Sequence, residues 1–234
     1  MAELLIPIRK FPKPEKMTEK QLLQASTLAL RIDTFRRSGD VTRIIKSSLV
    51  FQGPAGTPSR VSGNMIVKED TRTKGAIRPF SVATYRPDRR LSTPALLLEY
   101  KQRVWKRRVR CTRQLELGGQ KLGPPLFLHP AGEGLVRPPL EASDLSDMTF
   151  EWMQEAGILT SREDEEAGFR PHHICGAAAS KLVNLGRDRR TIAGSRWTSI
   201  KNFEKFYFRA QSFSKKQRQR AEKLEDTEVL RKRF

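Results

Sequence analysis

Histidine and cysteine side chains gather in one short stretch of this sequence. The segment "GFRPHHICGAAASKL" contains His172, His173 and Cys175. Imidazole and thiol groups this close could bind zinc, or form a nucleophile with its base. A structural zinc site needs four ligands in closely spaced pairs, and the remaining candidates, Cys111 and His129, supply no second pair. We therefore predict no metal site, and nothing else in the spacing supports a cysteine nucleophile.

The charge balance points to a polyanionic partner. Lys and Arg outnumber Asp and Glu by 45 to 26, which gives the 234-residue chain a formal net charge of +19. Nucleic acid is the first expectation and an anionic membrane the second. The sequence has no apolar run long enough to span a membrane and no signal-like N-terminus, and its two cysteines form no disulfide framework. We expect an intracellular protein in the nucleus or another nucleic-acid-containing compartment, neither secreted nor membrane-bound.

A run of basic residues, "KQRVWKRRVRCTR", contains no acid. On a helix its charges would cover most of the circumference, so they cannot all face a core. A solvated helix face is the plain interpretation, and contact with phosphates is the functional one. The candidate nucleic-acid-binding residues are Lys101, Arg103, Lys106, Arg107, Arg108, Arg110 and Arg113.

Aromatic residues crowd the segment "RWTSIKNFEKFYFRA" near the C-terminus. Trp197, Phe203, Phe206 and Phe208 recur at a spacing typical of a buried helix face. Tyr207, in the same segment, could be core or a nucleophile, and spacing alone does not decide between these roles.

The elements that must position these residues follow a helix–sheet–helix order. Residues 17–37 predict a helix that begins with a capping box of Thr18 and Gln21 and is broken by "SGD". The short β-rich runs "SSLVF", "GNMIVKE" and "AIRPFSVATY" predict a three-stranded antiparallel sheet. A helix over 92–110 follows, with Thr93 as N-cap, and "GGQKLGPP" is expected to be a loop.

Helices dominate the remainder of the predicted architecture. "SDLSDMTFEWMQEAG" predicts a helix closed by Gly157, and further helices follow the acidic segment "SREDEEAG". Prolines near the start keep residues 1–16 in an extended basic arm. The predicted fold class is a mostly helical α+β domain with a small three-stranded antiparallel sheet.

Read in order, these segments resemble the catalytic domain of tyrosine recombinases, the phage-integrase-like enzymes of DNA recombination and integration. "PHHICGAAASKLVNLGRDRRTIAGSRWTSIKNFEKFYFRA", "PDRRLSTPALLLEYKQRV", "RRSGDVTRI" and "MIVKEDTRTKGAIRPFSV" carry the resemblance. It is closest in flavour to the recombinases of DIRS-type and Crypton-type mobile elements. The resemblance covers residues 17–210, between the arm and a basic C-terminal helical tail, 211–234.

The resemblance implies a strand-cleaving and rejoining chemistry. Tyr207 would attack a DNA phosphodiester, forming a 3′-phosphotyrosine link and freeing a 5′-hydroxyl, with neither metal nor ATP nor another cofactor. Arg37 would grip the non-bridging oxygens, and Lys68, with Lys74 as the alternative, would protonate the leaving oxygen. The full set of implied catalytic residues is Arg37, Lys68, His172, Trp197 and Tyr207.

The sequence departs from the family pattern at one catalytic position and at one domain. Cys175 stands where the family has its second arginine, and a thiol has neither the guanidinium fork nor its fixed charge. We expect no counterpart of the family's N-terminal core-binding domain here, because the residues before 17 are too few to replace it. Three hypotheses follow: an active or weakly active DNA-cleaving and rejoining enzyme; a catalytically dead fold serving as a nucleic-acid-binding or structural subunit of a (ribo)nucleoprotein; and a basic helical domain whose aromatics are all core. The cysteine and the missing domain favour impaired catalysis over full activity.

The implied partner is duplex DNA, with RNA as the alternative. Segments beyond the nucleophile in this family often dock on a neighbouring protomer. The tail 211–234 could therefore support a homo-oligomer, or it could be a solvated basic helix.

Overall fold

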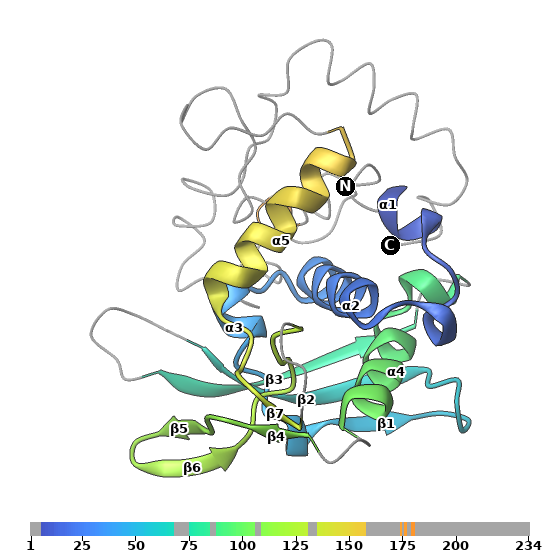
Figure 1. Ribbon diagram of the computed structural model, residues 1–234. Coiled ribbons are helices and arrows are strands. Elements are labelled where there is room, and N and C mark those ends of the chain that lie inside the picture. The colour runs from blue at the N-terminus through green and yellow to red at the C-terminus, as the bar shows by residue number, and fades with distance from the viewer. Residues whose placement is uncertain are drawn as a thin grey trace.

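The structure is a computed structural model that describes residues 6–67, 75–84, 88–105, 109–130 and 135–157, with the isolated positions 174, 176, 179 and 180. Figure 1 shows α2 and α4 on one face of a small sheet and the β5–β6 hairpin on the other side. The described helices are α1 (Ile6–Lys10), η2 (Pro14–Lys16), α2 (Glu19–Thr34), α3 (Ser38–Val41), η3 (Lys46–Ser48), η4 (Arg89–Leu91), α4 (Thr93–Trp105) and α5 (Ala142–Glu155). The strands are β1 (Val50–Gln52), β2 (Arg60–Val67), β3 (Ala76–Ala83), β4 (Arg110–Cys111), β5 (Leu115–Leu117), β6 (Gln120–Gly123) and β7 (Val136–Arg137).

The predicted three-stranded sheet is confirmed. Strands β1, β2 and β3 pair antiparallel in that order, and the register places Gly63 opposite Phe80. A Cβ on Gly63 would lie 2.9 Å from Leu49 Cδ2 and 3.1 Å from Phe80 Cε1, so glycine lets the helix-facing side of the sheet close. The alternating side chains of β2 that point the same way as Gly63, such as Val61 and Met65, are fully buried.

Helix α2 begins at the predicted capping box and runs through the middle of the core. Thr18 Oγ1 accepts the backbone N–H of Gln21 at 3.2 Å, and Gln21 Oε1 accepts that of Thr18 at 2.9 Å. The helix ends at Thr34, where Phe35 adopts a left-handed conformation with φ of 56°. The segment "SGD" does not simply break the helix, because these residues form the first turn of α3.

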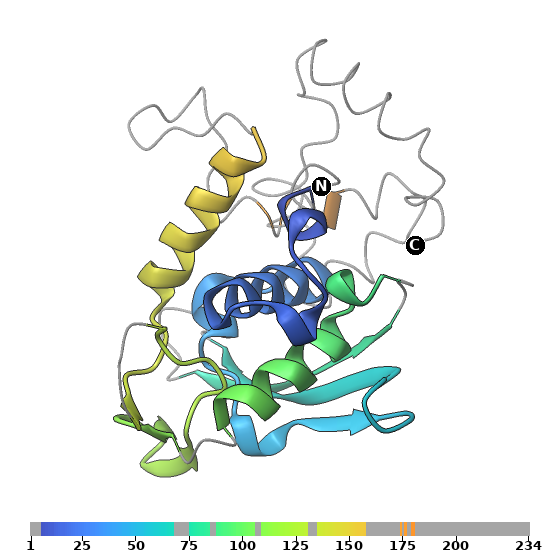
Figure 2. The ribbon, with the colours of Figure 1, turned by 45° about the vertical axis from the view of Figure 1, so that its right-hand side comes forward.

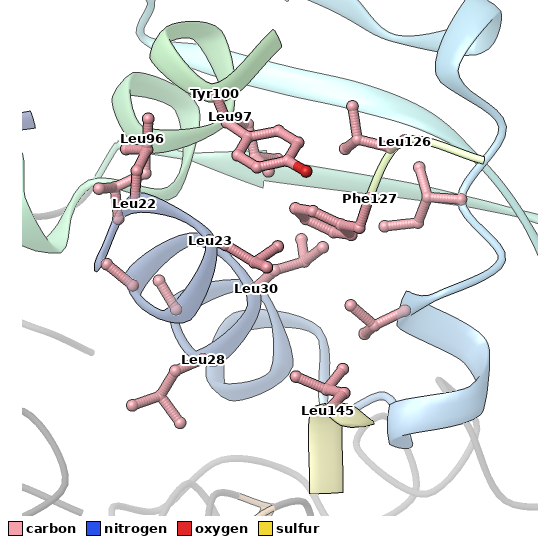
Figure 3. Close-up of a cluster of buried hydrophobic side chains, with 14 of the residues drawn as sticks. Leu22, Leu23, Leu28, Leu30, Leu96, Leu97, Tyr100, Leu126, Phe127 and Leu145 are labelled. Carbon is pink, nitrogen blue, oxygen red and sulfur yellow. The ribbon is translucent and has the colours of Figure 1, made fainter. Parts of the chain in front are cut away.

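Leucine side chains from α2 and α4 make up the centre of the core, and Figure 3 shows them converging. Tyr100 lies among them and is fully buried, so its hydroxyl needs partners inside the protein. That hydroxyl accepts the backbone N–H of Leu128 at 3.0 Å, and burial raises the pKa of the phenol. The labelled core residues are Leu22, Leu23, Leu28, Leu30, Leu96, Leu97, Tyr100, Leu126, Phe127 and Leu145.

The helix predicted over 92–110 differs from the structure at both ends. Ser92 is the N-cap instead of Thr93, since Ser92 Oγ accepts the backbone N–H of Ala95 at 3.5 Å. The Thr93 hydroxyl instead donates to Asp33 Oδ2 at 2.6 Å and ties α4 to the end of α2. The described helix stops at Trp105, and the chain continues into β4.

The loop predicted at "GGQKLGPP" is wrong for its middle residues, Gln120–Gly123, which form strand β6. Residues 115–123 form the β5–β6 hairpin, in which Gly118 and Gly119 occupy the turn with φ of 58° and 82°. Two consecutive positive φ values match the turn type that suits the twist of a two-residue hairpin. The pair of glycines therefore signals a hairpin turn within this segment.

The N-terminal residues 6–16 are not extended, contrary to the prediction. Proline is tolerated in the first turn of a helix, so Pro7 lies within α1, and Ile8 is fully buried. Phe11 packs edge-on against Trp152 of α5 with ring centroids 5.2 Å apart. Figure 2 shows this segment passing in front of α2 toward α4.

The predicted helix closed by Gly157 is confirmed as α5, and Gly157 has the left-handed φ of 71° that ends many helices. The helices predicted beyond it lie outside the described residues. No helix in the described part of the chain is long and apolar enough to cross a membrane. The same residues hold no cluster of three or more potential metal-ligating His, Cys, Asp or Glu side chains.

Candidate nucleic-acid interface

Arg37 stands at the start of α3 in a turn that the sequence builds locally. Its backbone is extended, with φ of −70° and ψ of 159°, and its side chain is exposed. The carboxylate of Asp40 accepts the backbone N–H of Arg37 at 3.4 Å, which caps the first turn. Asp40 is only 6% exposed and also lies 3.6 Å from the guanidinium of Arg43. The acid three residues after Arg37 therefore fixes the backbone from which that arginine projects.

The turn with Arg37 packs against the end of the sheet from which the predicted lysine segment departs. The backbone N–H of Ile66 donates to the carbonyl of Arg43 at 3.1 Å, and that of Ile45 donates to Asn64 at 2.9 Å. Strand β2 then ends at Val67, directly before Lys68. The fold thus brings the turn that begins at Arg37 to the end of the sheet at Val67, the residue before Lys68 in the sequence.

Helix α5 closes over the other side of α3. Ser146 Oγ donates to Ser38 Oγ at 3.3 Å. A Cβ on Gly39 would lie 3.7 Å from the Cβ of Ala142, so the two helices approach closely (Figure 1). Farther along the chain, Ile174 is fully buried in the common core. The residue two positions after His172 is therefore anchored to the same body that carries Arg37.

The basic run from Lys101 to Arg113 is divided among different surroundings. Arg110 is exposed on β4, and Arg113 is exposed and ion-paired with Glu141 at 2.5 Å. Lys101 lies with its ammonium group 5.6 Å from the ring centre of Phe51. The three middle residues, Lys106, Arg107 and Arg108, lie outside the described residues. The prediction of one continuous basic helix is wrong, because the helix ends before the run does.

The guanidinium of Arg103 is occupied by hydrogen bonds within the protein, which we call the Arg103 clamp. Its guanidinium donates to Glu99 Oε1 at 2.7 Å, to the carbonyls of Pro14 and Glu15 at 3.0 Å each, and to the carbonyl of Met17. Arg90 acts in the same way, donating to the carbonyl of Arg9 at 2.6 Å. Since these contacts occupy the donors of Arg103, we leave this residue out of the proposed interface.

Replacing Arg103 with methionine should destabilise the fold without removing a surface phosphate contact. Arg103→Met keeps the aliphatic stem but loses the charged hydrogen bonds, and we expect a loss of about 2 kcal/mol in the free energy of unfolding. Urea denaturation measures it. The matched control Arg110→Met, at an exposed position, should stay within about 0.5 kcal/mol of wild type. Equal stability of the two variants would show that the clamp contributes nothing.

The remaining candidate residues fall outside the part that the structure describes. These are Lys68, Lys74, His172, Trp197 and Tyr207, together with His173 and Cys175. Their roles stay predictions. One feature that the sequence did not reveal is the packing of Lys46 against Trp105, because nothing in the local pattern links the turn of η3 to the end of α4.

Comparison with known proteins bears on the fold. No protein-family model matches the chain, and no curated protein matches it. Among solved structures it is similar to the XerH site-specific recombinase in a pre-cleavage complex with difH substrate, at 12% identity and a TM-score of 0.58. That match covers 96% of this chain and 52% of the XerH chain. The described chain has a tyrosine recombinase catalytic-domain fold.

A second recombinase-type structure gives the same result. The Tn1549 transposon integrase in complex with transposon right end DNA matches at 16% identity and a TM-score of 0.51, over 96% of this chain and 63% of the integrase. The same integrase with circular intermediate DNA matches at 15% identity and a TM-score of 0.50, over 95% and 62%. The chain thus spans between about half and just under two thirds of the length of these recombinase-fold structures. These matches confirm the predicted α+β fold class.

Proposed function

We propose that this chain is a DNA-binding protein of the tyrosine recombinase type whose strand-cleaving chemistry is impaired. The observation that carries the proposal is the placement of Arg37. It projects from a capped turn at the end of the sheet that leads into Lys68, in a fold shared with recombinases described as DNA complexes. A net charge of +19 adds the electrostatic attraction that a polyanionic ligand requires.

The proposed chemistry assigns one step to each candidate residue. The Tyr207 oxygen would form a bond to phosphorus while the bond from phosphorus to the 5′ oxygen breaks. His172 is the candidate acceptor of the tyrosine proton, and Lys68, or Lys74, would deliver a proton to the departing 5′ oxygen. Arg37 and Trp197 would hold the phosphate oxygens, on which negative charge accumulates in the transition state.

Cys175 is the reason to propose impaired chemistry. A thiol at the position of the second arginine leaves one fewer fixed positive charge beside the phosphate in its pentacoordinate transition state. A catalytically dead fold that acts as a nucleic-acid-binding or structural subunit of a larger (ribo)nucleoprotein is the second candidate function, favoured by the same substitution.

Removing the Arg37 side chain tests the proposed interface. We expect Arg37→Ala to weaken binding to a short duplex by about tenfold, since one charge-assisted phosphate contact contributes about 1.4 kcal/mol or more. Fluorescence anisotropy with a labelled duplex measures the dissociation constant. The control Arg60→Ala removes an exposed arginine whose side chain, among the described residues, bonds only Ser81, at 3.0 Å. A variant at 37 that binds as tightly as the variant at 60 would argue against this site.

A further inference from the structure

Two lysines far apart in the sequence meet on the surface formed by η3, β1 and α4. The Lys46 ammonium lies 3.9 Å from the centre of the Trp105 ring, and the Lys101 ammonium lies 5.6 Å from the centre of the Phe51 ring. Both distances are within the range of cation–π attraction. We call these four residues the lysine–aromatic cluster.

The backbone around residues 124–126 fixes the first half of this cluster. Trp105 Nε1 donates to the carbonyl of Leu126 at 3.0 Å, which orients the indole ring. The backbone N–H of Lys46 donates to the carbonyl of Pro124 at 3.2 Å, two residues earlier on the same strand-like segment. The indole ring and the backbone of Lys46 are thus attached to one short piece of chain, which places the base of the lysine side chain beside the ring.

The lysine–aromatic cluster contains two positive charges and no negative one. Burial and the neighbouring positive charge of Lys101 lower the pKa of Lys46. Within the described part of the chain, neither lysine forms an ion pair with a carboxylate. Arg89, Arg103 and Arg113, by contrast, each have an acidic partner nearby. Two close, like charges supported by aromatic rings constitute a site that an anion would stabilise.

We propose that the lysine–aromatic cluster is a phosphate-binding site that contacts the backbone of a bound nucleic acid, in addition to the contact made by Arg37. This inference rests on the proposed function. Lysine binds phosphate as a point charge, so two ammonium groups can share one diester or grip two successive ones without reading the base sequence. The half-buried rings hold the charges at the surface and limit the side-chain freedom lost on binding.

Salt titration of duplex binding tests the proposal with the full-length chain. Lys46→Gln and Lys101→Gln should each weaken binding to a 20-bp duplex about fivefold. Each should also reduce the slope of log affinity against log salt by about 0.9, and the double variant by about twice that. The matched control is Lys20→Gln, which removes a lysine with a 62% exposed side chain that already lies 4.0 Å from Glu151. A double variant with the slope and affinity of the control would overturn the proposal while leaving DNA binding itself intact.

A second measurement tests the phosphate site without DNA. It decides the matter if the wild-type chain fails to bind duplex, a result that would refute the proposed function. Bound inorganic phosphate should raise the pKa of Lys46, since an anion favours the charged form of the amine. NMR of the lysine side-chain Cε and Nζ signals during a phosphate titration measures this change. In Lys101→Gln this response should be at least halved. Lys46 signals that do not respond to phosphate would contradict an anion site independently of any DNA result.

Discussion

Wild-type protein incubated with a nicked suicide duplex should form little or no covalent adduct, and Cys175→Arg should increase the yield or rate by about 100-fold or more. Removing one preorganised donor to a developing oxyanion lowers a rate by about 10²–10³. Returning the guanidinium should recover much of that factor. Denaturing gel electrophoresis of labelled DNA separates the adduct from free strand.

Two variants in the Cys175→Arg background make this result specific. Tyr207→Phe should abolish the adduct, because the phenyl ring has no oxygen with which to attack phosphorus. Cys175→Lys supplies charge without the planar fork and should recover much less than arginine. A strong wild-type adduct that Tyr207→Phe removes would contradict impaired catalysis and identify an active enzyme despite Cys175.

Duplex affinity should fall steeply as salt is raised, and this is the second large effect. A protein that contacts about six phosphates loses on the order of 10³ in affinity between 50 and 200 mM salt. The net charge of +19 is large enough to support that number of phosphate contacts across the chain. Anisotropy titrations at four or five salt concentrations give the slope directly.

The control for this experiment is the DNA sequence itself. Phosphate contacts carry no sequence information, so two unrelated duplexes should show similar slopes even if their absolute affinities differ. An affinity that does not change from low to moderate salt would remove the electrostatic basis for nucleic-acid binding. A single-stranded RNA of equal length, compared in the same series, tests the alternative partner.

Features of the fold that are encoded within a few residues were predictable from sequence. The reciprocal bonds of Thr18 and Gln21 need only one helical turn, and the glycine that ends α5 needs only its own positive φ. The three strands could be predicted because short runs rich in β-branched residues are separated by turn signals. The β5–β6 hairpin was missed because two glycines signal a flexible loop as readily as a two-residue turn.

The candidate site was less predictable, because its geometry depends on contacts between distant segments. The resemblance of "RRSGDVTRI" to the recombinases marked Arg37, and the cap from Asp40 shows how the acid three residues later holds the backbone of that arginine. No local pattern showed that Arg103 would be occupied by the backbone of residues 14–17, or that Lys46 would lie on Trp105. Such contacts depend on how α4 packs against its neighbours, which composition and periodicity do not specify.

An experimental structure of the chain on a duplex would test the central claim most directly. The measurement is the set of distances from one backbone phosphate to Arg37, Lys68, His172, Trp197 and Tyr207. We predict that the Arg37 guanidinium and the Tyr207 hydroxyl contact the same phosphate, with Lys68 or Lys74 beside its 5′ oxygen. A Tyr207 side chain packed in the core, away from the phosphate that Arg37 contacts, would contradict a recombinase-type site.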